Sequence, residues 1–184
     1  MNSDPLNPKH AILLTEYSLR LLSRRSYTMY EMEKKLRQRF KKFFNPGEGI
    51  KTGVEGAELG QDPVPSILSR LQTLGYLNDP QFCERWVEER CRLRPRGKYA
   101  LTQELRKKGI PKEVLDSYWE GREKSNNVLD ELPLASRLIE KKRSLLEKRY
   151  EPYQVKQKLS FYLASRGFSP DTIHRALDKT ISSR

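Results

Sequence analysis

Histidine and cysteine are scarce in this sequence, which has two of each among 184 residues. The sequence therefore offers few residues for a histidine-based catalytic triad or a Cys/His zinc site. Cys83 and Cys91 fall on one expected helix, where their spacing puts them about 12 Å apart along the axis. That separation excludes a disulfide between them. We expect two reduced thiols, as is usual in the cytoplasm.

Long apolar stretches are also missing. No run approaches the roughly 20 apolar residues of a membrane-spanning helix, and the opening residues MNSDPLNPKHAILL lack the basic region and the apolar length of a signal peptide. We therefore expect a cytoplasmic protein with no membrane partner. Only 36% of the residues are hydrophobic, which favours several thin helical cores over one large core.

Positive charge is what the sequence has in excess. The chain contains 36 Lys and Arg against 24 Asp and Glu, for a formal net charge of +12. Such a balance favours a polyanionic partner, which can be nucleic acid, an acidic protein surface or anionic lipid. A basic surface that serves only solubility is the alternative interpretation.

Helical periodicity dominates the chain and recurs in three copies. Three expected helices end at a glycine followed by a hydrophobic residue, at Gly75, Gly109 and Gly167, which is typical of the Schellman motif. The repeat predicts an all-α protein of three tandem three-helix repeats, stacked in series into an elongated, curved molecule. In each copy a tyrosine stands six residues before a leucine, as Tyr30 and Leu36, Tyr99 and Leu105, and Tyr153 and Leu159.

Cap residues indicate where two of the helices begin. Thr28 is followed three residues later by Glu31, which is the spacing of a capping box. Asn78 or Asp79 can cap a later helix, because Pro80 suits the first helical position. The chain therefore carries its own start signals for the second helix of the first repeat and the first helix of the second.

The expected boundaries follow the repeat. The segments are a first repeat at 10–77 with a flexible, glycine-rich loop at 45–62, a second repeat at 78–120, a linker at 121–132 and a third repeat at 133–182. Within the loop, PGEGIKTG is superficially similar to a phosphate-binding loop, but Gly49 and Lys51 are not adjacent and no strand precedes them. We therefore expect no cofactor, no metal and no catalytic residue.

The tyrosines at the start of each second helix have two interpretations. Tyr27, Tyr30, Tyr99 and Tyr153 could stack on nucleic-acid bases. They could instead pack in the core at the beginning of these helices. The sequence favours the core.

Basic residues recur with the repeat and are the candidate binding residues. Between Arg90 and Lys108 there are eight cations and a single carboxylate, Glu104. Any one cluster could be a solvated face, but clusters in register with a structural repeat favour a track for a polyanion. The candidates are Arg24, Arg25, Lys34, Lys35, Arg37, Arg90, Arg92, Arg94, Arg96, Lys98, Arg106, Lys107 and Lys108.

Three segments of the chain resemble the RecX family, regulators of the bacterial RecA recombinase. They are LGYLND at 74–79 followed by Phe82, LRKKGI at 105–110, and the segment from Tyr30 to Leu36. The resemblance covers about residues 21–42 and 65–119, and is weaker over 134–178. Two features depart from it: the loop at 45–62 is longer than the usual link, and Cys83 stands where a small alanine is common.

The resemblance implies a non-catalytic protein of three tandem three-helix modules. It implies binding to the RecA–DNA filament, in its helical groove, and modulation of filament growth and ATP-dependent activities, and hence of DNA recombination, repair and the SOS response. The implied partners are the RecA filament and single- and double-stranded DNA, bound by a cytoplasmic monomer. Inhibition is the expected direction, with stimulation left open. The alternative is a stand-alone basic helical protein that binds DNA or RNA with no RecA partner.

Overall fold

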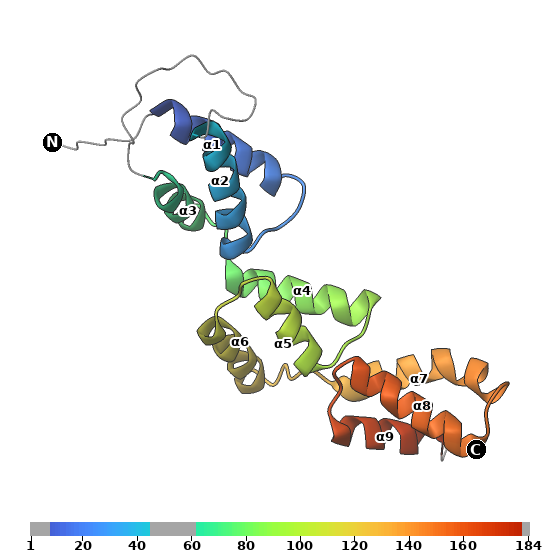
Figure 1. The fold of residues 1–184 in the computed structure, drawn as a ribbon. Helices are drawn as coiled ribbons and strands as arrows, with labels where there is room; N and C mark the ends of the chain where they lie inside the picture. The colour runs from blue at the N-terminus through green and yellow to red at the C-terminus, as the bar shows by residue number, and fades with distance from the viewer. Residues whose placement is uncertain (1–7, 45–61, 182–184) are drawn as a thin grey trace. The chain divides into compact units, whose positions relative to one another are not determined.

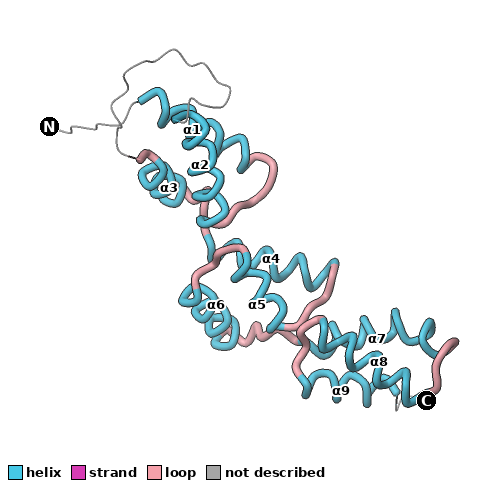
Figure 2. Tube along the Cα trace, in the orientation of Figure 1, coloured by secondary structure: helices cyan, strands magenta, loops and turns pink. Residues whose placement is uncertain are grey.

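The computed structural model describes residues 8–44 and 62–181, and the regular elements in these ranges are all α-helices (Figures 1 and 2). This confirms the all-α class predicted from the periodicity. Residues 1–7 and nearly all of the glycine-rich loop at 45–62, with its PGEGIKTG sequence, lie outside the described residues.

Nine helices occupy the described part of the chain and form three successive groups of three. The first repeat contains α1 (Pro8–Leu22), α2 (Met29–Phe44) and α3 (Val64–Thr73). The second contains α4 (Asp79–Leu93), α5 (Lys98–Lys107) and α6 (Lys112–Lys124). The third contains α7 (Glu131–Glu147), α8 (Pro152–Ser165) and α9 (Pro170–Ile181). Because α6 runs to Lys124 and α7 begins at Glu131, the non-helical part of the expected linker is 125–130.

The helices pack into two compact units. The first unit holds the chain up to Phe82 together with Lys108–Ile110, and the second holds Cys83–Lys107 and the chain from Pro111 onward. In the first unit α1, α2 and α3 contact one another, and in the second α7, α8 and α9 do so. The apolar faces of these two bundles are their cores, with Leu14, Met32, Leu36 and Leu71 buried in the first and Ile139, Leu159, Leu163 and Leu177 in the second.

Helix ends follow the chemistry that the sequence predicts. The Thr28 hydroxyl accepts a hydrogen bond from the Glu31 N–H at 3.1 Å, and the Asn78 side-chain oxygen accepts one from the Gln81 N–H at 2.9 Å. Both residues therefore cap the helices that follow them.

Three glycines at helix ends take the left-handed backbone conformation. Gly75, Gly109 and Gly167 have φ values of 75°, 80° and 79°. After two of them the Schellman hydrogen bond forms, from the Tyr76 N–H to the Leu71 carbonyl at 2.9 Å and from the Phe168 N–H to the Leu163 carbonyl at 3.3 Å.

The core interpretation of the repeated tyrosines is wrong for three of the four. Tyr27 is buried, but Tyr30, Tyr99 and Tyr153 are 51%, 70% and 70% exposed. Each of the three is the second residue of its helix, six positions before a buried leucine. Six residues turn a helix by about 600°, so the tyrosine lies about 120° away from the leucine around the axis and misses the core.

Candidate functional site

The candidate cations fall into two classes, according to whether a carboxylate of the chain binds them. The distinction matters because a cation already paired inside the fold must break that contact before it can neutralise a phosphate. The paired class centres on two carboxylates, Glu104 and Glu31.

Glu104 holds two of the basic residues that surround it in the sequence. One of its oxygens accepts hydrogen bonds from Arg90 Nε at 2.8 Å and from Trp86 Nε1 at 3.0 Å. Its other oxygen lies 2.9 Å from Arg96 Nε. The Arg90 guanidinium also lies over the Trp86 ring, 4.5 Å from its centroid. Arg90 and Arg96 therefore stabilise the second repeat instead of projecting from it.

In the first unit, Glu31 likewise binds two of the candidate cations. Lys108 Nζ lies 3.0 Å from one carboxylate oxygen and an Arg25 guanidinium nitrogen lies 3.2 Å from the other. Burial alone would raise the pKa of Glu31, but the hydrogen bond and charge of Lys108, the charge of Arg25 and the backbone of Thr28 together lower it. Glu31 is thus held in its charged form.

Two more candidates are paired at the surface. Arg37 contacts Glu33 at 2.8 Å and Asp62 at 2.6 Å, and these hydrogen bonds are the main reason that its pKa is raised. Lys98 Nζ lies 2.9 Å from Glu123. Exposed pairs of this kind are screened by solvent and are easily exchanged for another anion.

The remaining candidates are exposed and form no ion pair with a carboxylate in residues 8–44 or 62–181. They are Arg24, Lys34 and Lys35 in the first unit and Arg92, Arg94, Arg106 and Lys107 in the second. The structure does not bring the last four together, because Arg94 precedes α5 whereas Arg106 and Lys107 lie in its final turn, about 15 Å away along the helix. We call these seven residues the unpaired cations.

Sequence reasoning missed a set of contacts that joins successive repeats. In the first unit the Thr28 hydroxyl donates a hydrogen bond to the Lys108 carbonyl at 2.7 Å, and the Met29 N–H donates to the Asp79 carboxylate at 3.0 Å. Burial is the main reason that the pKa of Asp79 is raised, with the nearby charge of Glu31 adding to it. Asp79, considered as a cap of its own helix, instead caps α2.

The second unit repeats this arrangement one repeat further along. The Gly97 N–H donates to the Arg166 carbonyl at 3.0 Å, and the Lys98 N–H donates to the Glu131 carboxylate at 2.5 Å. Asp79 and Glu131 are each the first residue of the first helix of a repeat, and this shared position is the feature of the sequence that could have identified them.

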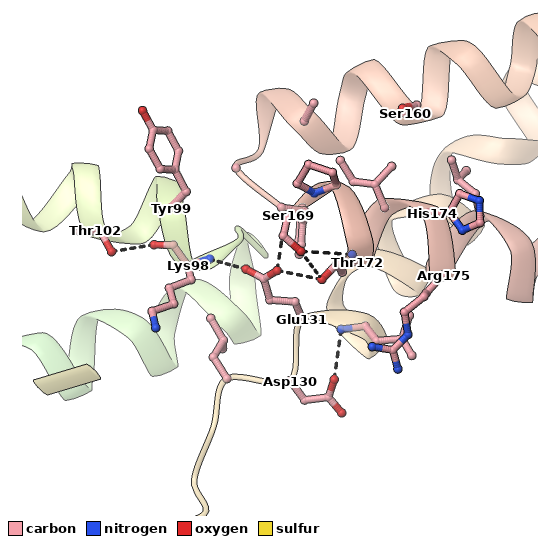
Figure 3. A pocket seen from close by; sticks show the side chains of 18 of the residues that line it. Lys98, Tyr99, Thr102, Asp130, Glu131, Ser160, Ser169, Thr172, His174 and Arg175 are labelled. Carbon is pink, nitrogen blue, oxygen red and sulfur yellow. Dashed lines mark hydrogen bonds between the residues drawn. The ribbon is translucent and has the colours of Figure 1, made fainter. Parts of the chain in front are cut away.

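Glu131 also ties α7 to the start of α9. Its second carboxylate oxygen accepts hydrogen bonds from the Thr172 hydroxyl at 3.0 Å and from the Ser169 N–H at 3.4 Å (Figure 3). One carboxylate therefore joins α5, α7 and the 169–172 turn within the second unit.

A wide groove with a volume of about 1590 Å³ lies beside this carboxylate in the second unit. Residues of α5, α6, α8, α9 and the 128–132 segment line it, and most of its lining is apolar. Three aromatic side chains on its wall project toward solvent, since Tyr99, Tyr153 and Phe161 are 70%, 70% and 68% exposed.

Residues 8–44 and 62–181 contain neither a cluster of metal ligands nor a helix that could span a membrane. Within these ranges no three or more His, Cys, Asp and Glu side chains are grouped so that they could hold a metal ion. No helix there has the length and apolar composition needed to cross a bilayer. Both cysteines lie on α4, and burial raises the pKa of Cys91, which disfavours a reactive thiolate.

Comparisons with known proteins agree on one family. Family models match residues 78–117 as the second three-helix domain of RecX and residues 130–177 as the third. The chain is 31% identical over 134 residues to the regulatory protein RecX of Chlorobium phaeobacteroides, covering 73% of this chain and 83% of that protein. It is 31% identical over 172 residues to the regulatory protein RecX of Trichlorobacter lovleyi, covering 88% and 92%.

The fold is also found in a solved structure. The crystal structure of RecX from Lactobacillus salivarius matches with a TM-score of 0.72 at 19% identity, covering 95% of this chain and 99% of that one. The match supports the tandem arrangement of three-helix repeats that the sequence predicts.

Proposed function

This chain belongs to the RecX family of regulatory proteins, and from that premise we propose that it is a non-catalytic regulator of the RecA recombinase. It binds the RecA–DNA filament and inhibits filament growth and ATP hydrolysis, and thereby recombination and SOS activity. It acts in the cytoplasm as a monomer that contacts both the recombinase and DNA.

The observation that carries this proposal is the set of unpaired cations. All seven are exposed and meet no carboxylate in the described part of the chain. They can therefore contact phosphates or acidic side chains without breaking an internal ion pair. Contacts with phosphates would release the counterions condensed on DNA, which makes affinity strongly dependent on salt.

Tandem repeats suit a long, periodic partner. The first and second repeats each contribute a few contacts of modest strength, and the chain links them so that the contacts of the second repeat form at a high effective concentration. A filament offers the same surface at regular intervals. Inhibition then follows from occupying successive positions along the filament, and no chemical step is needed.

The experiment is a titration of this protein into RecA filaments assembled on single-stranded DNA, with the rate of ATP hydrolysis as the readout. We expect hydrolysis to slow at protein concentrations too low to coat the DNA. If all seven unpaired cations contact duplex phosphates, the logarithm of the DNA-binding constant should fall against the logarithm of salt with a slope of about −6.

The same titration separates the proposal from a stand-alone nucleic-acid-binding protein. Such a protein would slow hydrolysis only at concentrations that saturate the DNA, by displacing the recombinase. That outcome, or an unchanged rate at every concentration, would contradict the proposal.

A further inference from the structure

Three exposed aromatic rings line the groove of the second unit and lie outside its buried core. Tyr99 is the second residue of α5, while Tyr153 and Phe161 lie on α8. Each leaves more than two thirds of its surface in solvent, with exposed fractions of 70%, 70% and 68%. In Figure 3 the Tyr99 ring stands clear of the contacts that Glu131 makes. Large rings left in water without packing are characteristic of a binding surface.

The rings on α8 belong to a continuous outer stripe of that helix. Tyr153, Gln157 and Phe161 are spaced four residues apart, so they lie on one side of α8 and all line the groove. The opposite side, which includes Leu159 and Leu163, is buried in the core. One face of α8 therefore packs in the core, and a second face of aromatic and amide side chains is exposed to solvent.

The second helix of the preceding repeat carries a matching stripe. Tyr99, Gln103 and Lys107 occupy the positions on α5 that Tyr153, Gln157 and Phe161 occupy on α8. Tyr99 and Gln103 line the groove from the α5 side. The same tyrosine–glutamine pair thus faces the groove from two helices.

The charges of the groove favour an anionic occupant. Its three carboxylates are already bound within the fold: Glu123 pairs with Lys98, Asp130 accepts the Leu132 N–H at 3.1 Å, and Glu131 accepts two N–H groups and the Thr172 hydroxyl. Arg106 lines the groove with no carboxylate partner among the described residues, and the unpaired Lys107 follows it in the chain.

We propose that this groove binds single-stranded nucleic acid, with successive bases stacked on Tyr99, Tyr153 and Phe161 and a phosphate on Arg106. Exposed aromatic platforms beside cations and amides suit bases, which offer a flat face and polar edges. An apolar helix of a protein partner would leave the guanidinium of Arg106 without a counter-charge. The site deepens the DNA contact of the proposed function, but it requires no recombinase.

The test is a binding titration with two labelled probes of equal length and charge. One is a deoxythymidine 15-mer, and the other is a 15-mer phosphodiester chain without bases, each followed by fluorescence anisotropy. We expect the wild-type protein to bind the thymidine probe at least about fivefold more tightly, since stacking contributes to each base contact. Y99A, Y153A and F161A should each weaken thymidine binding about fivefold or more and leave the base-free probe unchanged.

Two controls separate stacking from other causes. Y99F and Y153F keep the ring and should bind like the wild type. Y76A removes an exposed tyrosine from outside the groove and should also have no effect, since Tyr76 belongs to the first unit. Circular dichroism of each variant verifies that its helices are intact.

Equal affinity for the two probes would overturn the proposal, as would alanine variants that bind thymidine normally. If the triple alanine variant bound thymidine normally but no longer bound RecA, the groove would be a protein site, which also overturns it. Loss of thymidine binding together with retained inhibition of the filament ATPase would support the groove assignment, and the proposed function would stand.

Discussion

The two junctions between successive repeats share their hydrogen bonds and differ in what surrounds them. Each joins the start of one repeat's second helix to the next repeat through a carbonyl just before a left-handed glycine and through a carboxylate. The bonds are Thr28 to Lys108 and Met29 to Asp79 in the first unit, and Gly97 to Arg166 and Lys98 to Glu131 in the second. The arrangement is therefore a property of the repeat and not of one pair of helices.

At the first junction, the surrounding contacts are made by side chains, and most of these are charged. Tyr30 fills the space in front of Gly109, and the buried Asp79 lies close enough to Glu31 for the charge of Glu31 to raise its pKa. Lys108 and Arg25 offset this repulsion by pairing with Glu31.

At the second junction, the backbone of α5's first turn and the backbone around Gly167 lie in close contact. Gly97 faces the Gly167 carbonyl, and Gly167 faces the backbone and methyl group of Ala100. Ala100 fills the space in front of this glycine, and the neighbouring Tyr99 is exposed. Movement of the Tyr30 ring can relieve part of the close contact at the first junction, whereas the close contacts at the second involve backbone atoms and a methyl group.

The largest effects should come from methyl groups added at the second junction. A Cβ at Gly97 would overlap the Gly167 carbonyl, and a Cβ at Gly167 would overlap Ala100 in addition to the strain of its positive φ. We expect Gly97→Ala to lower the free energy of unfolding by about 3 kcal/mol and Gly167→Ala by about 4 kcal/mol. Urea denaturation followed by circular dichroism measures both.

Two other glycines are matched controls. Gly75 has a positive φ with nothing near its Cβ position, so Gly75→Ala should cost only the backbone strain of about 1 kcal/mol. Gly121 lies in α6 with open space around it, and Gly121→Ala should be stabilising by up to about 1 kcal/mol. If Gly97→Ala behaved like Gly121→Ala, the close backbone contact would be refuted.

The corresponding substitution at the first junction should lower the free energy of unfolding less, and a second substitution should restore part of the loss. A Cβ at Gly109 would overlap both the ring and the Cβ of Tyr30. Only the ring can swing into solvent, so we expect Gly109→Ala to cost about 3 kcal/mol, which is less than Gly167→Ala. Removing the ring in Gly109→Ala/Tyr30→Ala should restore the part of that loss that the ring causes, and leave the overlap with the retained Cβ of residue 30 and the backbone strain. A double-mutant cycle in urea measures the coupling, and additive effects would contradict the contact.

The smallest effect is the dependence of stability on pH that the first junction should show. The pKa of Glu31 lies below its ordinary value of 4.5, so its ionised form stabilises the fold above that value and the contribution is lost as the pH falls through the folded-state pKa. Glu31→Gln should lose on the order of 1 kcal/mol at pH 7, and the loss should shrink as the pH falls below 4.5.

Asp79 should respond in the opposite direction. Its pKa lies above the ordinary value of 3.8, so the stability it gives is present below that value and is lost as the pH rises through the folded-state pKa. Asp79→Asn keeps an acceptor for the Met29 N–H and should therefore improve relative to the wild type as the pH rises. Thermal unfolding between acid and neutral pH measures both variants. Glu89→Gln, at an exposed position of α4, is the control for the removal of one carboxylate.

The sequence predicts what is local and periodic. The Thr28 cap and the left-handed glycines follow from spacing within one helix or turn, and each is confirmed. The core prediction is wrong for Tyr30, Tyr99 and Tyr153. The repeated interval of six residues shows that these positions are equivalent, without showing which side of the helix they occupy. The elongated, curved shape stays a prediction.

Contacts between residues that are far apart in the chain cannot be predicted from the spacing of residues in the sequence. Glu104 is near Arg90 and Arg96 in the chain, so its pairing could have been proposed from proximity. Lys108, in contrast, meets Glu31 across 77 positions, and only the fold brings them together. This pairing divides the basic clusters into cations that hold the protein together and cations available to a partner.

That division is tested most directly by two variants with the same change in charge. Arg106→Glu/Lys107→Glu reverses two unpaired cations of α5, and Lys112→Glu/Lys124→Glu reverses two exposed cations of α6 that pair with Asp116 and Glu120. We expect the first variant to raise the concentration needed for half-inhibition of the RecA filament ATPase about tenfold or more, and the second to change it less than about twofold. Equal shifts for the two variants would show that only net charge matters and would contradict the account.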